Sequence, residues 1–231
     1  MGTLLKLKSN KFRLCFISAL IVLILSLGLV SHQVEGKVKV TASERVILDL
    51  DTDIAVFEGN VTIIYENIKI TADRAEVKER KIAVLTGNTK LVQIDMILTG
   101  KNFIVYINEN KIIAEGDVFL IKGETEIDEI QNSHGEENIT TIACEKMMLF
   151  TKERGFTAEG DIEVRRGLSL AKADYATYKE EEEKVILTGN VTAEGKNGEK
   201  IECNMLIFGT DKDYMEAEAE VVFEFSIDRE D

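Results

Sequence analysis

A two-residue step, Gly followed by Asn or Asp, recurs along this chain at nearly constant intervals and constrains its fold more than any other feature. Successive steps are 28, 29, 44, 29 and 30 residues apart. A period of this length is typical of repeat proteins, in which no unit buries its apolar face alone and neighbours complete the core. The steps are Gly59-Asn60, Gly87-Asn88, Gly116-Asp117, Gly160-Asp161 and Gly189-Asn190, with a degenerate copy at Ala219-Glu220.

These positions predict six repeats and one insertion. The interval of 44 is explained by the stretch from Lys122 to Asn138, which is polar, acidic and without periodicity, so we expect an exposed loop there. The repeats cover about Thr41–Asn67, Ile68–Ile94, Asp95–Gly123, Thr140–Gly167, Leu168–Gly195 and Lys196–Ser226.

The repeats read as extended strands, because their runs are rich in Val, Ile, Thr, Phe and Tyr and alternate with period two. In the second repeat Ile68, Ile70 and Ala72 share one face. The apolar set then shifts by one residue, to Ala75 and Val77, which predicts a bulge or corner. The Gly-Asx step predicts a second kink, since both residue types tolerate positive φ. We therefore expect an all-β fold of about twelve bent antiparallel strands, with no helix after residue 37.

The same alternation nominates the residues that face the interior. From the residues alone, these side chains either line an apolar trough or fill a dry core. The candidates are Ile70, Ala72, Ala75, Val77, Leu98, Phe103, Val105, Ile142, Met147, Leu149, Ala173, Ala176, Tyr178, Leu206 and Phe208.

Residues 1–36 have the pattern of an export segment. Lys6, Lys8, Lys11 and Arg13 precede an uncharged apolar run over residues 14–30. A small-residue cleavage site before Lys37 would make this a secretory signal. An uncleaved run would instead be a membrane anchor, although it is slightly shorter than the ~20 residues that span a bilayer as a helix. Both alternatives place residues 37–231 outside the cytoplasm.

Charge and motifs exclude several classes of protein. The chain has a formal net charge of −14, which disfavours nucleic acid as a partner. His134 is the only histidine after residue 37, and no Gly-rich phosphate loop is present. The spacing Asp49-x-Asp51-x-Asp53 resembles the start of a calcium loop, but Ile54 occupies the position that requires Gly. We therefore expect no catalytic residues, no cofactor and no metal, and hence no enzyme.

Cys144 and Cys203 occupy the same corner position in the fourth and sixth repeats. With the fifth repeat between them, two spacings of about 4.8 Å would separate their Cα atoms by nearly 10 Å. A disulfide needs about 4.4–6.8 Å. We therefore predict two buried free thiols.

Both ends of the predicted stack are candidate docking edges. The stretches from Lys37 to Leu50 and from Ala219 to Ile227 alternate apolar and polar residues and contain no Pro. Open strands of this kind invite strand addition by another chain. The alternative is a frayed or self-covered terminus.

The motifs also resemble a known family. T-A-D-R-A-E-V at Thr71–Val77 followed by T-G-N at Thr86–Asn88, and A-D-Y-A-T-Y at Ala173–Tyr178 followed by T-G-N-V at Thr188–Val191, resemble the OstA-like repeat of the LptA and LptC proteins of lipopolysaccharide transport. The resemblance covers about Thr41 to Phe225.

This resemblance implies a twisted β-jellyroll with a hydrophobic lumen that holds the acyl chains of lipopolysaccharide. It further implies a periplasmic location, pathway proteins docked at both edge strands, and head-to-tail self-association. Within it, a cleaved signal favours a soluble LptA-like bridge, and an uncleaved one favours an LptC-like adaptor anchored by residues 14–30. A structural β-repeat module of the envelope without lipid binding is the alternative from another class.

Overall fold

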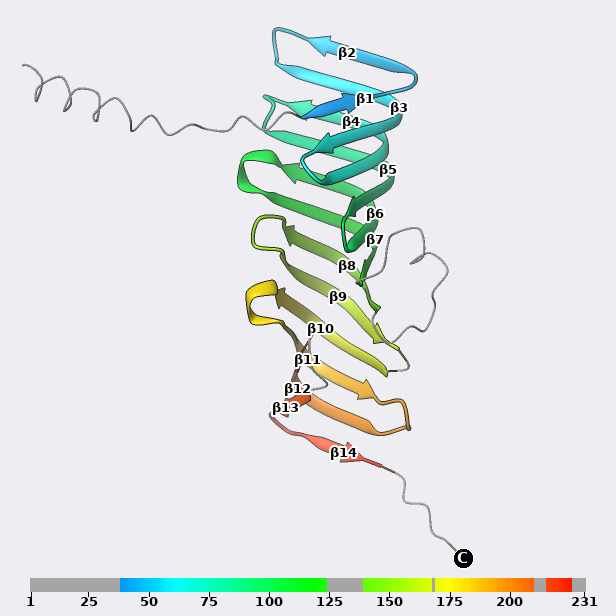
Figure 1. Cartoon of the computed structure of the whole chain (residues 1–231), viewed down its shortest axis with the longest axis vertical. Helices are drawn as coiled ribbons and strands as arrows, with labels where there is room; N and C mark the ends of the chain where they lie inside the picture. Colours follow the sequence, from blue (N-terminus) through cyan, green and yellow to red (C-terminus); the bar gives the residue numbers. More distant parts are fainter. Residues whose placement is uncertain (1–37, 124–138, 168, 210–214, 226–231) are drawn as a thin grey trace, which may run out of the picture. The chain divides into compact units, whose positions relative to one another are not determined.

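A single antiparallel sheet makes up the described part of the chain. The computed structural model describes residues 38–123, 139–167, 169–209 and 215–225. Figure 1 shows the strands in chain order along the stack. They are β1 (Lys39–Thr41), β2 (Arg45–Asp49), β3 (Ile54–Tyr65), β4 (Ile68–Lys78), β5 (Ile82–Gln93), β6 (Met96–Tyr106), β7 (Lys111–Lys122), β8 (Thr140–Phe150), β9 (Gly155–Arg166), β10 (Ser169–Lys179), β11 (Lys184–Glu194), β12 (Lys200–Gly209), β13 (Met215–Glu218) and β14 (Val222–Glu224).

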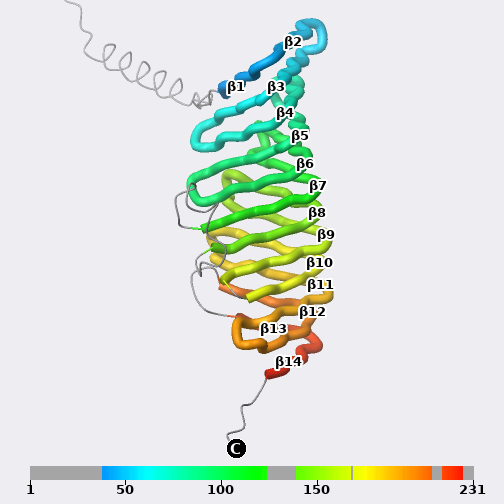
Figure 2. Tube along the Cα trace, turned by 90° about the vertical axis from the view of Figure 1, so that its right-hand side faces the viewer, coloured from blue at the N-terminus to red at the C-terminus, as the bar shows by residue number. Residues whose placement is uncertain are grey.

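The sheet is not closed into a barrel, and it is twelve strands wide. From β3 to β12, each strand pairs with the next one in the sequence. At one end, β1 and β2 both pair with β3, so they form one interrupted edge strand. At the other end, β13 and β14 both pair with β12. Figure 2 shows this succession from β1 and β2 to β13 and β14. The all-β fold and the count of about twelve antiparallel strands are thus confirmed.

Two details differ from the expectation. The hairpin turns after β6 and β10 each contain a single turn of 3-10 helix, η1 (Ile107–Glu109) and η2 (Glu180–Glu182), so the region after residue 37 is not free of helical turns. Each ends on a left-handed residue, Asn110 or Glu183, which reverses the chain. Lys122, which we expect in the insertion, instead ends β7, because it pairs with Thr140 of β8. Residues 124–138 lie outside the described residues.

Every Gly-Asx step lies at a corner in the middle of a strand. Gly87 and Asn88 have φ of 77° and 46°, and the degenerate pair Ala219-Glu220 keeps the same conformation at 61° and 57°. The register shows the consequence, since the two residues Gly87 and Asn88 of β5 oppose the single residue Lys101 of β6. The same two-against-one offset occurs at all five intact steps. A bulge of this kind bends the strand and increases its twist.

At two of these corners an asparagine side chain is hydrogen-bonded to an aspartate of the neighbouring strand. The side-chain amide of Asn88 donates to Oδ2 of Asp73 at 2.9 Å, and that of Asn190 donates to Oδ2 of Asp174 at 2.8 Å. Both aspartates occupy the matching position of their repeats. Their role is therefore to bridge adjacent strands at the corner.

The core lies on one face of all the bent strands. In β4, Ile68, Ile70 and Ala72 are buried before the corner, and Ala75 is buried after it. The phase change predicted from the sequence is thus present in the fold. Buried residues from β3 to β12 form one continuous cluster.

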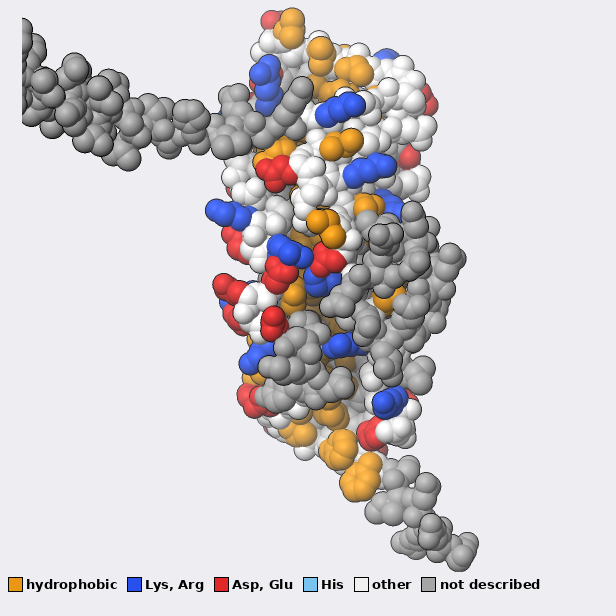
Figure 3. Space-filling view, in the orientation of Figure 1, with side chains coloured by type: hydrophobic (Ala, Val, Ile, Leu, Met, Phe, Trp, Pro, Cys, Tyr) orange, Lys and Arg blue, Asp and Glu red, His pale blue; other side chains and the backbone are white. Residues whose placement is uncertain are grey.

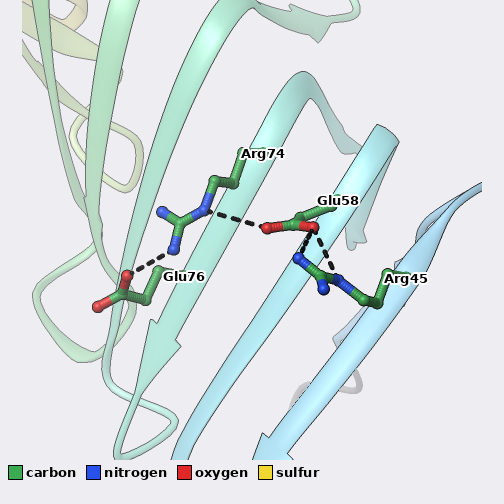
Figure 4. Close-up of polar contacts among 4 residues, drawn as sticks. All are labelled: Arg45, Glu58, Arg74 and Glu76. Carbon is green, nitrogen blue, oxygen red and sulfur yellow. Dashed lines mark hydrogen bonds and ion pairs between the residues drawn. The ribbon is translucent and has the colours of Figure 1, made fainter.

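The opposite face of the sheet is charged. Figure 4 shows a ladder of ion pairs on β2, β3 and β4. Arg45 contacts Glu58 at 2.6 Å, Glu58 contacts Arg74 at 3.8 Å, and Arg74 contacts Glu76 at 3.1 Å. The Arg45–Glu58 pair joins the short edge strand β2 to β3 by side chains as well as by the backbone.

Candidate functional site

The interior of the bent sheet is the candidate site. Twelve of the fifteen residues nominated from the sequence are buried there, and Val77, Val105 and Phe208 are half-buried against the same cluster. They come from the even-numbered strands β4, β6, β8, β10 and β12. The structure thus brings all fifteen into one apolar interior, and their role in holding a lipid stays a prediction.

The odd-numbered strands supply inward residues that the sequence analysis missed. The residue directly after each Gly-Asx step is almost completely buried, at 0–1% exposure. A usable signal was present, because the step is followed by Val, Thr or Ile in every intact copy. These residues are Val61, Thr89, Val118, Ile162 and Val191. The polar member, Thr89, donates its hydroxyl to the carbonyl oxygen of Gly100.

The two ends of the bent strands face each other across the opening of the apolar interior. We call this opening the mouth. Hairpin turns alternate between the two ends of the strands, so the β5–β6 turn and the β8–β9 turn belong to opposite ends. A straight strand of 11 or 12 residues would be roughly 35 Å long. Yet Oδ2 of Asp95, in the first turn, lies 3.2 Å from Nη2 of Arg154, in the second. The strands are therefore bent until their ends face each other.

We call these two series of strand ends rim A and rim B. Rim A contains the turns at 79–81, 107–110, 151–154 and 180–183, and rim B contains those at 66–67, 94–95 and 195–199. Beside Asp95, two further contacts cross the mouth. Lys122 lies 5.6 Å from the centre of the Tyr178 ring, and Arg166 donates to the carbonyl oxygen of Gly209 at 3.2 Å.

Beneath the central contact, the interior is nearly filled. The cavity there has a volume of about 20 Å³, about enough for one water molecule. Its apolar walls come from both rims, with Met96 and Leu120 on one side and Leu149, Phe156 and Tyr178 on the other. The Phe156 and Tyr178 rings stack with centroids 5.6 Å apart. At this point there is room for an acyl chain only if the two walls separate.

The comparison with known families identifies the chain. The family described as "LptA/(LptD N-terminal domain) LPS transport protein" matches residues 39–83 and 69–214. The chain belongs to this family. The resemblance noted in the repeats is thereby confirmed. The two matched ranges overlap, as is natural when one repeat unit can align to the array in more than one register.

The other comparisons add little to the LptA/LptD N-terminal assignment. A search of curated protein sequences finds no match to the chain. Among solved structures, one similar chain is LptH from Pseudomonas aeruginosa, described as the LptA-homologous periplasmic component of the conserved lipopolysaccharide transport device. The similarity has a TM-score of 0.48 at 15% identity, and it covers 57% of this chain and 95% of that one.

Both ends of this LptA/LptD N-terminal family member expose apolar side chains. At the β2 edge, Leu48 is 63% exposed and Leu50 is 90% exposed. At the other edge, Phe223 and Phe225 are 55% and 60% exposed and stack on each other. Figure 3 shows hydrophobic side chains at both ends of the stack and charged side chains of both signs between them. The C-terminal edge differs from the predicted stretch 219–227, because it is formed by β13 and β14 with a corner between them.

Both cysteines of the described sheet are buried and free, as predicted. The expected separation was wrong, however. Cys144 lies on β8 and Cys203 on β12, which are four strand steps apart in the sheet and not two. Four spacings place them roughly 19 Å apart. Burial raises the pKa of Cys144 to about 11, and it also raises the pKa of Cys203.

The aspartate-rich stretch at residues 49–53 makes hydrogen bonds within itself. Asp49 accepts hydrogen bonds from the backbone N–H groups of Asp51 and Thr52, at 3.0 and 3.3 Å, and so forms a local turn. Among the residues that the structure describes, no group of three or more His, Cys, Asp and Glu side chains is placed to hold a metal ion. Within the same residues, no helix is long and apolar enough to cross a bilayer. The candidate anchor at 14–30 and His134 lie outside the described residues.

Proposed function

We propose that this chain carries lipopolysaccharide through the periplasm, as an LptA-like bridge between the inner and outer membranes. The observation that carries the proposal is the continuous apolar cluster from β3 to β12. Exposing an acyl chain of about a dozen methylenes to water costs on the order of 10 kcal/mol, at about 0.8 kcal/mol per methylene. An apolar path along the whole sheet avoids this cost without any chemical step.

The inward residues named above form the walls of this path. In the proposed working state the rims separate, and the acyl chains take the place of the side-chain contacts that now close the interior. The phosphorylated sugar headgroup stays in water at the mouth. Energy for directional movement comes from another member of the pathway.

Photocrosslinking tests the proposal. A benzoylphenylalanine in place of Phe103, which is fully buried, is expected to crosslink to lipopolysaccharide when the chain is expressed in a lipopolysaccharide-producing host. The matched control replaces Tyr175, an aromatic residue that is 56% exposed on the outer face. Equal crosslinking at both positions, or none at Phe103, would contradict lipid carriage in the interior.

The exposed edges at β2 and β14 are the proposed docking sites for pathway partners or for further copies of the chain. Unpaired strand edges add strands from another chain through backbone hydrogen bonds, and side chains such as Leu48 and Phe223 would be covered in the process. Photoreactive residues at 48 and 223 should therefore crosslink to protein partners. Protein crosslinks found only at Tyr175, in the middle of the stack, would count against this arrangement.

A specific feature favours each of two alternative functions. The apolar run at 14–30 favours an LptC-like adaptor if it stays uncleaved. Its test is the N-terminal residue of the exported chain, determined by intact mass. The small volume of the cavity beneath the central contact favours a structural envelope module without lipid binding. The structural module would be the better account if the purified chain neither retains nor accepts lipopolysaccharide.

A further inference from the structure

Four charged residues form a cluster across the mouth. Asp95 on rim B contacts Lys122 of the same rim at 2.7 Å and Arg154 of rim A at 3.2 Å. Arg154 in turn contacts Glu180 of rim A at 3.0 Å. We call these four residues the latch. Two cations and two anions alternate in it, so each charge has an opposite neighbour.

The contacts across the mouth, the latch included, all join strand ends that are three strands apart in the sheet. Asp95 and Arg154 join turns that are three strands apart, β5–β6 and β8–β9. Lys122 and Tyr178 join the ends of β7 and β10, and Arg166 and Gly209 join the ends of β9 and β12, again three strands apart. The twist of the sheet thus sets one constant offset between the rims. Apart from packing, the rims are joined here by side-chain contacts and not by strand pairing.

We infer that the latch is a gate, and that lipid acyl chains enter the interior sideways between Asp95 and Arg154 when it opens. This inference rests on the proposed function. The small cavity with apolar walls lies directly beneath the latch and is lined by residues of both rims. Opening the gate therefore widens an existing apolar space, and no strand has to leave the sheet.

The strength of the latch suits a gate. Its side chains are 27–46% exposed, so water competes for their charges and the pairs add little net stability. Neighbouring strands of the sheet, by contrast, are joined by continuous backbone hydrogen bonds, which are much harder to break. The rims therefore separate at the latch before any strand pair opens.

The test locks the mouth after folding. In a background with Cys15→Ala, Cys144→Ala and Cys203→Ala, Asp95→Cys and Arg154→Cys are joined by a short thiol-to-thiol crosslinker. The control joins Lys81→Cys and Ile107→Cys, which are neighbours on rim A, because the backbone N–H of Ile107 donates to the carbonyl oxygen of Lys81 at 2.8 Å. Uptake of purified lipopolysaccharide is read from crosslinking to benzoylphenylalanine at position 103.

The locked form is expected to lose most of its uptake, and the rim A control is expected to keep it. In a chain without crosslinks, Asp95→Asn should take up lipid several-fold faster, because the carboxylate that joins both cations is gone. Uptake by the locked form at the rate of the control would overturn the gate and leave the proposed function intact. No uptake by any form, the chain without crosslinks included, would overturn the proposed function and the gate with it.

Discussion

Gly87 lies directly against Asp73 of the neighbouring strand. A Cβ atom built on Gly87 would stand only 2.3 Å from Oδ2 of Asp73. A Cβ atom built on Gly189 would likewise stand 2.6 Å from Oδ2 of Asp174. The glycine at this corner therefore combines a positive φ with the space that the aspartate side chain needs.

Gly87→Ala should destabilise the sheet more than Gly198→Ala does. Both glycines have positive φ, so each substitution costs roughly 1–2 kcal/mol of backbone strain. Nothing lies within 4 Å of a Cβ at Gly198, whereas at Gly87 the Asp73 side chain must move. We expect an additional loss of about 1 kcal/mol or more at Gly87, measured by urea unfolding. Equal losses would mean that only φ matters at the corner.

Leu85→Ala should lower the free energy of unfolding by about 2–5 kcal/mol, because Leu85 is fully buried and its removal leaves a cavity. Leu50 is the matched control, since it is 90% exposed. Leu50→Ala should change stability by less than about 0.5 kcal/mol. Chemical denaturation of both variants provides the comparison. A small effect at Leu85 would show that the interior is loosely packed.

The two thiols should react slowly while the chain is folded. Burial raises the pKa of Cys144 from 9.0 to about 11, which lowers its thiolate fraction at pH 8 by roughly 100-fold. Alkylation of Cys144 by iodoacetamide is therefore expected to be at least roughly 100-fold slower in the folded chain than in guanidinium-unfolded protein. Peptide mapping by mass spectrometry follows both sites. A Cys144–Cys203 disulfide in the non-reduced sample would contradict the strand order between β8 and β12.

The latch should weaken in acid. Burial acts to raise the pKa of Asp95, but the hydrogen bond and charge of Lys122, together with the charge of Arg154, outweigh it and hold the pKa below the usual 3.8. A lowered folded-state pKa stabilises the fold above the unfolded value of about 3.9, and this contribution is lost as the pH falls through the folded-state pKa.

The stability difference between the wild-type chain and Asp95→Asn measures this contribution. It is expected to be about 1 kcal/mol or less at pH 7, since the group is partly exposed, and to disappear as the pH falls through the folded-state pKa of Asp95. Glu180 is the second carboxylate that contacts Arg154, at 3.0 Å, so Glu180→Gln serves as the control. A difference that grows towards acid pH would mean that Asp95 is not held in its charged form.

Much of the fold was readable from the sequence because it depends on near neighbours. Alternation along β4 predicts which of its residues are buried, and the Gly-Asx step predicts a kink because its residues tolerate positive φ. The inward residues after each step, such as Val61 and Val118, carried the same local signal and could have been found. The cysteine separation was misjudged because a repeat contributes two strands to the sheet, not one.

The closure of the interior depends on contacts between residues that lie far apart in the sequence. Asp95 and Arg154 are 59 residues apart, and Arg166 and Gly209 are 43 apart, with no shared pattern in the sequence. Their contact depends on the bend at each corner and on the twist summed over three strands. Small angles accumulate along the sheet, so no local rule sets which rim residues meet. The strands, the corners and the apolar face follow from local sequence patterns, whereas the enclosure of this face follows from the bend and twist accumulated over several strands.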